Sequence, residues 1–174
     1  VSTLLIQVLK ELETFLREDT PVYILETQEK LDTYLADEDI QEEIQKITNV
    51  RLVWVPLDID HYNSLYEFMS APEHREIRCA IILSDNLFVD ENLSKQEQKE
   101  VADSLTISRL LSLRKIQADL MPELFITCEM NYDENKNLAE RTGSEDYIVG
   151  SNVAASVMTQ ISQARELHRI FYEI

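Results

Sequence analysis

The chain has few of the residues on which nucleotide-binding loops and zinc sites depend. Glycine occurs only twice in 174 residues, as Gly143 and Gly150. This scarcity excludes a P-loop, a GxGxxG dinucleotide fingerprint and a glycine-rich oxyanion loop within the residues given. The three histidines, His61, His74 and His168, lie far apart in the sequence, so we expect no zinc site.

Basic residues are also scarce. The chain holds 16 Lys and Arg against 33 Asp and Glu, and the difference, 16 − 33, gives a net charge of −17. Binding to nucleic acid requires a basic face, so this balance argues against a general nucleic-acid partner. It argues equally against docking on anionic lipid. The charge instead favours cations or basic partners.

Long apolar runs and paired cysteines are absent as well. No run approaches the roughly 18 residues of a membrane helix, so we expect no membrane insertion by this segment. Cys79 and Cys128 lie in separate apolar runs without a CxxC pair, which predicts two buried, reduced thiols in a cytosolic compartment. There is no GxSxG motif and no cysteine with a visible histidine partner. We therefore assign no catalytic residue and expect that the chain is not an enzyme.

Helical patterns alternate with short apolar runs along the chain. The apolar runs predict strands at 22–25, 52–55, 79–83, 124–128 and 147–149. Periodic segments predict helices at 3–18, 28–47 with a break near 37–39, 61–70, 94–120, 135–141 and 151–174. This alternation predicts an α/β fold, a Rossmann-like doubly wound parallel sheet with helices on both faces.

The chain begins on a helix, whereas a Rossmann unit begins on a strand that lies at the centre of its sheet. Either a first strand precedes Val1 or the sheet does without it, and we expect the former. We divide the chain into one lobe over residues 1–150 and a long exit helix over residues 151–174, which leads towards a following subdomain or a partner.

Acidic residues lie at the ends of four predicted strands. They are Glu26, Asp58 with Asp60, Asp85 and Glu129. In a doubly wound sheet these positions gather at the carboxyl edge, where ligands bind. Closely spaced carboxylates repel unless a cation lies among them, and calcium takes six to eight oxygen ligands.

Two overlapping sites are predicted at this edge. The candidate metal ligands are Asp58, Asp60, Asp85 and Glu129, and calcium or another divalent cation is the expected ion. The candidate small-molecule ligands are Glu26, Asp58, Asp85 and Asn86, and a nucleotide is one such ligand, since an acid that ends a second strand holds the ribose in dinucleotide sites. The alternative for each acid is that it caps the following helix or faces water.

From Cys79 onward the chain resembles the cytosolic domains of the CASTOR/POLLUX family of ion channels, which are similar to RCK domains. The residues that carry the resemblance are Ala80-Ile81-Ile82-Leu83-Ser84-Asp85, Ala102-Asp103-Ser104, the run Arg109 to Ala118, Cys128-Glu129, Asp146-Tyr147-Ile148-Val149 and Ser151-Asn152. Residues 1–78 agree mainly in the order of their elements.

The resemblance implies an RCK-type sensor lobe on the cytoplasmic side of a membrane. It implies a homo-oligomer, as a dimer or gating ring, that changes the opening of a channel's pore domain when an ion or small molecule binds. Family ligands include nucleotides and calcium, and Asp85 and Glu129 match family acids. Two alternatives remain. One is a fragment of a Rossmann-type nucleotide-dependent enzyme, and the other is an acidic protein-interaction domain.

Overall fold

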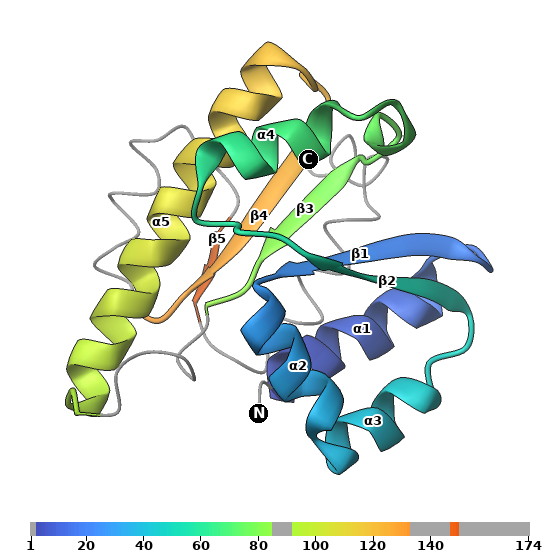
Figure 1. Ribbon diagram of the computed structural model, residues 1–174, viewed down its shortest axis with the longest axis horizontal. Coiled ribbons are helices and arrows are strands. Elements are labelled where there is room, and N and C mark those ends of the chain that lie inside the picture. The colour runs from blue at the N-terminus through green and yellow to red at the C-terminus, as the bar shows by residue number, and fades with distance from the viewer. Residues whose placement is uncertain (1–2, 85–91, 133–146, 150–174) are drawn as a thin grey trace, which may run out of the picture. The chain divides into compact units, whose positions relative to one another are not determined.

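The computed structural model describes residues 3–84, 92–132 and 147–149 (Figure 1). These residues fall into two compact units, which divide between Leu57 and Asp58. The predicted lobe over residues 1–150 therefore contains two units. The helices predicted at 135–141 and 151–174 lie outside the described residues.

The first unit pairs two parallel strands with three helices. Its elements are α1 (Thr3–Phe15), β1 (Thr20–Glu26), α2 (Gln28–Ala36), α3 (Glu38–Gln45) and β2 (Val50–Pro56). The strands are in register from Thr20 opposite Val50 to Glu26 opposite Pro56. A core cluster joins these three helices through Ile6, Leu31, Tyr34 and Ile40. Packed against it are Leu5 of α1, Ile44 of α3 and Trp54 of β2.

The helical pattern over residues 28–47 is broken where the sequence predicts it. Asp37 has an extended backbone and follows α2 directly. Its carboxylate accepts a hydrogen bond from the Ile40 backbone N–H at 3.2 Å, so Asp37 acts as the N-cap of α3. An acidic cap satisfies a backbone donor that the helix leaves open. The cap therefore fixes the point at which the chain turns from one helix to the next.

The turn between α1 and β1 is fastened to the residues that precede β2. The Asn49 side-chain amide donates to the carbonyl oxygens of Glu13 at 2.8 Å and Leu16 at 3.0 Å. These bonds satisfy acceptors at the end of α1 that the helix leaves open. Asp19, whose N–H donates to the Asn49 carbonyl at 2.8 Å, has a φ of 63°. A left-handed backbone at a residue other than glycine costs free energy, although aspartate tolerates it better than most.

Replacing Asp19 by glycine is therefore expected to stabilise the protein by about 0.5 to 1 kcal/mol, because glycine adopts a positive φ without a steric penalty. Its exposed ion pair with Arg51, at 3.7 Å, adds little and is lost in the variant. Urea denaturation measures the change. Glu18→Gly is the matched control, since Glu18 has no positive φ. The control should be less stable than the wild type, and a loss of stability in Asp19→Gly would contradict the argument.

The second unit holds a parallel three-stranded sheet. Its elements are α4 (Tyr62–Ser70), the short 3-10 helix η1 (Pro72–His74), β3 (Cys79–Ile82), α5 (Lys95–Asp119), β4 (Phe125–Met130) and β5 (Tyr147–Val149). The strand order is β3-β4-β5. β4 is longer than the predicted run at 124–128, so Glu129 lies inside the strand near its carboxyl end. The burial of Glu129, described below, explains this difference.

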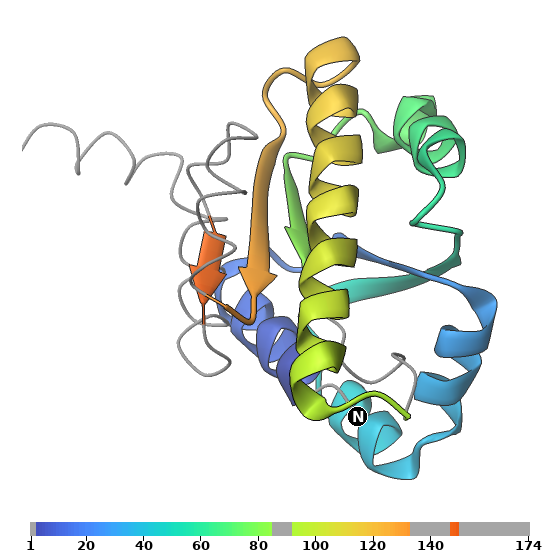
Figure 2. The same cartoon turned by 90° about the vertical axis from the view of Figure 1, so that its left-hand side faces the viewer.

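The long helix α5 lies along β3 and β4 (Figure 2). A capping box starts it, in which the Ser94 and Glu97 side chains each bond the other residue's backbone N–H. One stripe of the helix is buried against the sheet: Ala102, Asp103, Thr106, Arg109, Leu110, Leu113 and Ile116. An acid and an arginine inside such a stripe need polar partners, since burying an unpaired charge is costly.

The predicted α/β class with parallel strands is confirmed. The pairings place the strands in two sheets, β1-β2 and β3-β4-β5, so the single doubly wound sheet is not confirmed. Among the described helices, none is both long enough and apolar enough to cross a membrane.

Candidate functional site at the carboxyl ends of β3 and β4

A buried polar network lies where β3 and β4 end, and Asp103 of α5 is its centre. The Asp103 carboxylate accepts hydrogen bonds from the Asn131 N–H at 2.7 Å, the Asn131 side-chain amide at 2.9 Å and the Tyr132 N–H at 3.2 Å. The same amide donates to the Ser84 hydroxyl at 2.6 Å. Asp103 is 1% exposed. These bonds join α5 to the residues that follow β3 and β4.

Glu129 is the second carboxylate of this network. It is 7% exposed, and one of its oxygens accepts a hydrogen bond from the Ser84 backbone N–H at 2.9 Å. The pKa of Glu129 is raised to about 7, chiefly by burial; the hydrogen bond from the Ser84 N–H opposes the rise, and the nearby charge of Asp103 adds to it. No lysine or arginine of the described residues forms an ion pair with Glu129. The site therefore holds a buried carboxylate that is costly to ionise.

Two buried hydroxyls belong to the same elements. Within the described part of the chain, the side-chain oxygens of Thr106 and Thr127 have no hydrogen-bond partner. Thr127 and Glu129 are two residues apart on β4 and so share a face of the strand. Asp103 and Thr106 are three apart on α5 and share a face of the helix. Buried polar groups are normally satisfied, so these hydroxyls are open to a bound molecule or a water.

The loop that leads into α4 is anchored to α5 by a guanidinium–carboxylate pair. Arg109 Nε donates to Asp60 Oδ1 at 2.7 Å, and its Nη2 donates to Oδ2 at 3.3 Å. The Arg109 side chain is 7% exposed, whereas that of Asp60 is 44% exposed. The positive charge beside the Asp60 carboxylate is thus the guanidinium of Arg109. The Lys115 ammonium lies 4.4 Å from the centre of the Tyr62 ring and provides a second contact between α5 and α4.

Asp58 has a local structural role in the same loop. Its carboxylate accepts a hydrogen bond from the Asp60 N–H at 3.3 Å, the pattern of an Asx turn. Its carbonyl accepts from the His61 N–H at 3.3 Å. The observed contacts of Asp58 are thus those of a turn-forming acid.

Glu26 belongs to the first unit, where it ends β1. It is 8% exposed, and its carboxylate lies 3.2 Å from the Lys30 ammonium one turn into α2. An ion pair at this spacing is common on helices. Lys30 therefore offsets the charge of Glu26 at the end of the strand.

The described residues bring together only part of the predicted sites. Asp85 and Asn86 lie outside them. Of the other predicted ligands, Glu129 lies in the network with Asp103, while Asp60 is paired with Arg109. Within residues 3–84, 92–132 and 147–149 there is no group of three or more His, Cys, Asp or Glu residues that could hold a metal ion.

The search for acids at the ends of predicted strands did not identify Asp103, Ser84 or Asn131 as site residues. Asp103 had a signal in the sequence, because it occupies the inward stripe of a helix at the spacing of Thr106, Leu110 and Leu113. An acid at such a position needs buried donors. The partners of Asp103 lie 28 and 29 residues away, so no local pattern identifies them.

Neither cysteine shows the properties of a nucleophile. Cys128 is fully buried, and burial raises the pKa of the Cys79 thiol to about 12. A thiol becomes reactive when its pKa falls, because the thiolate is the nucleophile.

No known protein-family model matches this chain, and no curated protein matches it in sequence.

Proposed function

We propose that this chain is a ligand-sensing regulatory domain that binds a cation, as a free ion or as part of a small molecule, beside Glu129 at the carboxyl ends of β3 and β4. The observation that carries the proposal is the burial of Glu129 without a basic partner among the described residues. A cation would offset the cost of ionising this carboxylate. The hydroxyls of Thr106 and Thr127, on the same helix and strand as Asp103 and Glu129, have no hydrogen-bond partner among the described residues.

The strand orders support a Rossmann-like framework for such a domain. In the doubly wound order 3-2-1-4-5-6, removing strand 1 leaves two groups, 3-2 and 4-5-6. The observed orders, β2-β1 and β3-β4-β5, are all parallel and match these groups. Ligands of this fold bind at the carboxyl edge, where Glu129 lies.

Calcium is not held by the described residues alone. It needs six to eight oxygens, whereas the Asp103 carboxylate already accepts three hydrogen bonds and Asp60 is paired with Arg109. A calcium site therefore requires the predicted ligand Asp85. A single organic or monovalent cation beside Glu129 needs less negative charge around it than calcium does.

The binding test uses calorimetric titration of the chain with calcium chloride, potassium chloride and NAD, which carries a cationic nicotinamide ring, one at a time. Glu129→Gln removes the proposed charge, and Glu100→Gln, on the exposed face of α5, is the control with the same change in net charge. We expect at least one ligand to bind the wild type and the control, and to bind Glu129→Gln at least tenfold more weakly. A cation requires the ionised carboxylate, so affinity should fall about tenfold per unit below pH 7. Equal binding to all three proteins contradicts the proposed site.

Regulation requires that binding changes an assembly. We propose that the chain forms a homo-oligomer, a dimer or gating ring, coupled to the pore domain of a channel on the cytoplasmic side of a membrane. A ligand then shifts the ring only through unequal affinity for its states. On α5, Val101, Leu105 and Leu111 are 37–51% exposed and offer an apolar surface to a second copy. Light scattering after size-exclusion chromatography measures the oligomeric state. A chain that stays monomeric at high concentration and binds none of the ligands tested above would overturn the proposal.

A further inference from the structure

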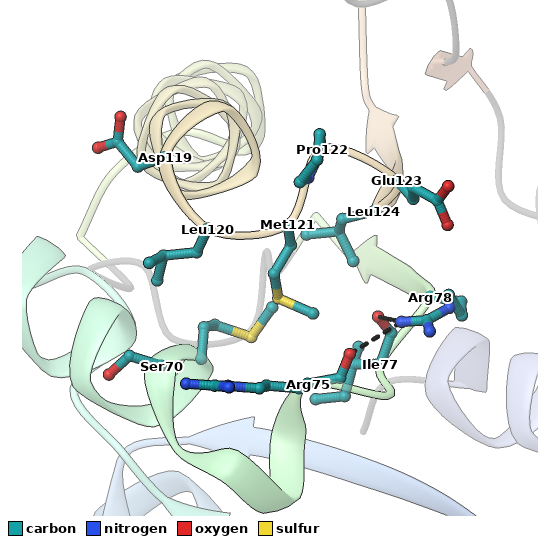
Figure 3. Close-up of a pocket in the computed structure, with 11 residues that line it drawn as sticks. Ser70, Arg75, Ile77, Arg78, Asp119, Leu120, Met121, Pro122, Glu123 and Leu124 are labelled. Carbon is teal, nitrogen blue, oxygen red and sulfur yellow. Dashed lines mark hydrogen bonds between the residues drawn. The ribbon is translucent and has the colours of Figure 1, made fainter.

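A cavity lies in the second unit, at the amino ends of β3 and β4. It is therefore at the opposite end of these strands from Glu129. Its volume is about 400 Å³. One wall comes from the end of α4 and the segment that leads into β3, and the other from the end of α5 and the loop into β4 (Figure 3). This position is independent of the site proposed above.

The wall formed by the loop into β4 is apolar and held by backbone bonds. Leu120, Met121 and Leu124 project from it towards the cavity (Figure 3). The Leu124 N–H donates to the Met121 carbonyl at 2.8 Å, and the Gln117 side-chain amide donates to the Leu124 carbonyl. Met121 and Leu124 are 7% and 2% exposed. A ligand that meets this wall needs little further ordering of the loop, which favours binding.

The opposite wall carries a cation. The Arg75 side chain extends along it towards Ser70, facing Leu120 and Met121 across the cavity (Figure 3). In the described part of the chain no carboxylate forms an ion pair with the Arg75 guanidinium. Arg78, by contrast, is engaged, because its Nη1 donates to the carbonyl oxygens of Arg75 at 2.8 Å and Ile77 at 3.4 Å.

Two acids also line the cavity, yet they do not cancel this charge. The carboxylates of Asp119 and Glu123 point outward at the two ends of the loop, away from the space between the loop and Arg75 (Figure 3). The cavity therefore combines an apolar wall, which includes the sulfur of Met121, with the guanidinium of Arg75, an exposed residue, on the opposite wall. Guanidinium binds carboxylate through two parallel hydrogen bonds.

We infer that this cavity binds a small apolar carboxylate, with its carboxylate on Arg75 and its apolar part against Leu120, Met121 and Leu124. The cavity lies within the size range of small-molecule sites. The net charge of −17 repels anions at long range, but at physiological salt charges beyond about 8 Å are largely screened. Recognition thus depends on direct contact with Arg75. The carboxylate belongs either to a free acid or to the C-terminus of a peptide.

The test follows the methyl resonances of the methionines by NMR while hexanoate is added to the chain. We expect shifts at Met69 and Met121, which line the cavity, and none at Met130, which is buried in β4. Acetate, which lacks the apolar part, and 1-hexanol, which lacks the charge, should bind at least tenfold more weakly. N-acetyl-Leu-Leu with a free carboxylate distinguishes the two sources, since tighter binding than hexanoate assigns the site to a peptide C-terminus and weaker binding to a free acid.

Arg75→Gln tests the charge, and Arg51→Gln, an exposed arginine of the first unit, is the matched control. Circular dichroism checks that both variants fold. We expect Arg75→Gln to weaken hexanoate binding about tenfold and Arg51→Gln to leave it unchanged. The inference is overturned if neither hexanoate nor N-acetyl-Leu-Leu shifts the methyl resonances of Met69 and Met121. It is also overturned if 1-hexanol binds as well as hexanoate, or if folded Arg75→Gln retains wild-type affinity for hexanoate.

Discussion

Replacing Asp103 by alanine is expected to lower the free energy of unfolding by about 3 to 5 kcal/mol, because three partly buried N–H donors lose the buried carboxylate that accepts from them. Two of these donors belong to Asn131 and one to Tyr132, so the substitution also frees the end of β4 from α5. The residue is 1% exposed, which leaves little room for water to replace the carboxylate. Urea denaturation followed by circular dichroism measures the loss.

Two further variants separate the hydrogen bonds from the volume of the side chain. Asp103→Asn keeps the size but replaces one acceptor oxygen by a donor, so it should lose about 2 kcal/mol. Ser104→Ala changes the exposed neighbour on the same helix and should alter stability by no more than about 0.5 kcal/mol. A loss in Asp103→Ala below about 1 kcal/mol would show that the network does not hold α5 in place.

Replacing Glu129 by glutamine is expected to stabilise the protein at alkaline pH and to have little effect at pH 5. The pKa of Glu129 is about 7 in the folded protein, against 4.5 in an exposed glutamate, because the carboxyl is buried. The neutral form is therefore favoured by folding. Its contribution is fully present below pH 4.5 and is lost as pH rises through 7. Between pH 5 and 8 this loss is on the order of 2 kcal/mol in the wild type.

The measurement is the difference in unfolding free energy between the variant and the wild type, taken at several values of pH. Other groups titrate in both proteins, so the difference isolates Glu129. Glu97→Gln is the control of opposite sign. Its bonds with Ser94 lower the pKa of Glu97, so this variant should be less stable than the wild type at pH 8, and the gap should narrow as pH falls through that lowered pKa. A difference for Glu129→Gln that does not grow between pH 5 and 8 contradicts the raised pKa.

If a cation binds beside Glu129 as proposed, stability and ligand binding are linked at this site. A bound cation lowers the pKa of the carboxylate beside it and removes the cost of ionisation. The wild type should then gain most from a cationic ligand above pH 7, where Glu129→Gln has nothing to gain. In the absence of a ligand, the ionised Glu129 carboxylate therefore lowers the stability of the protein above pH 7.

Within the described residues, the sequence by itself determined the order of the strands and of the helices other than η1, with limits close to those observed. The period of apolar residues is a local property, so it predicted all five strands and the break at Asp37 without any knowledge of the fold. It also predicted that an acid lies at the end of β4. The ion pair of Glu26 with Lys30 joins residues only four positions apart, so both partners lie close together in the sequence.

The tertiary structure alone decided which partner each of the other acids has. Asp60, predicted as a metal ligand, is paired with an arginine 49 residues away, and Asp103 accepts hydrogen bonds from residues 28 and 29 positions further along the chain. Strand pairing likewise separated β1-β2 from β3-β4-β5. Such partners depend on where helices pack against strands, and a pattern that repeats every two to four residues carries no information about contacts over that distance.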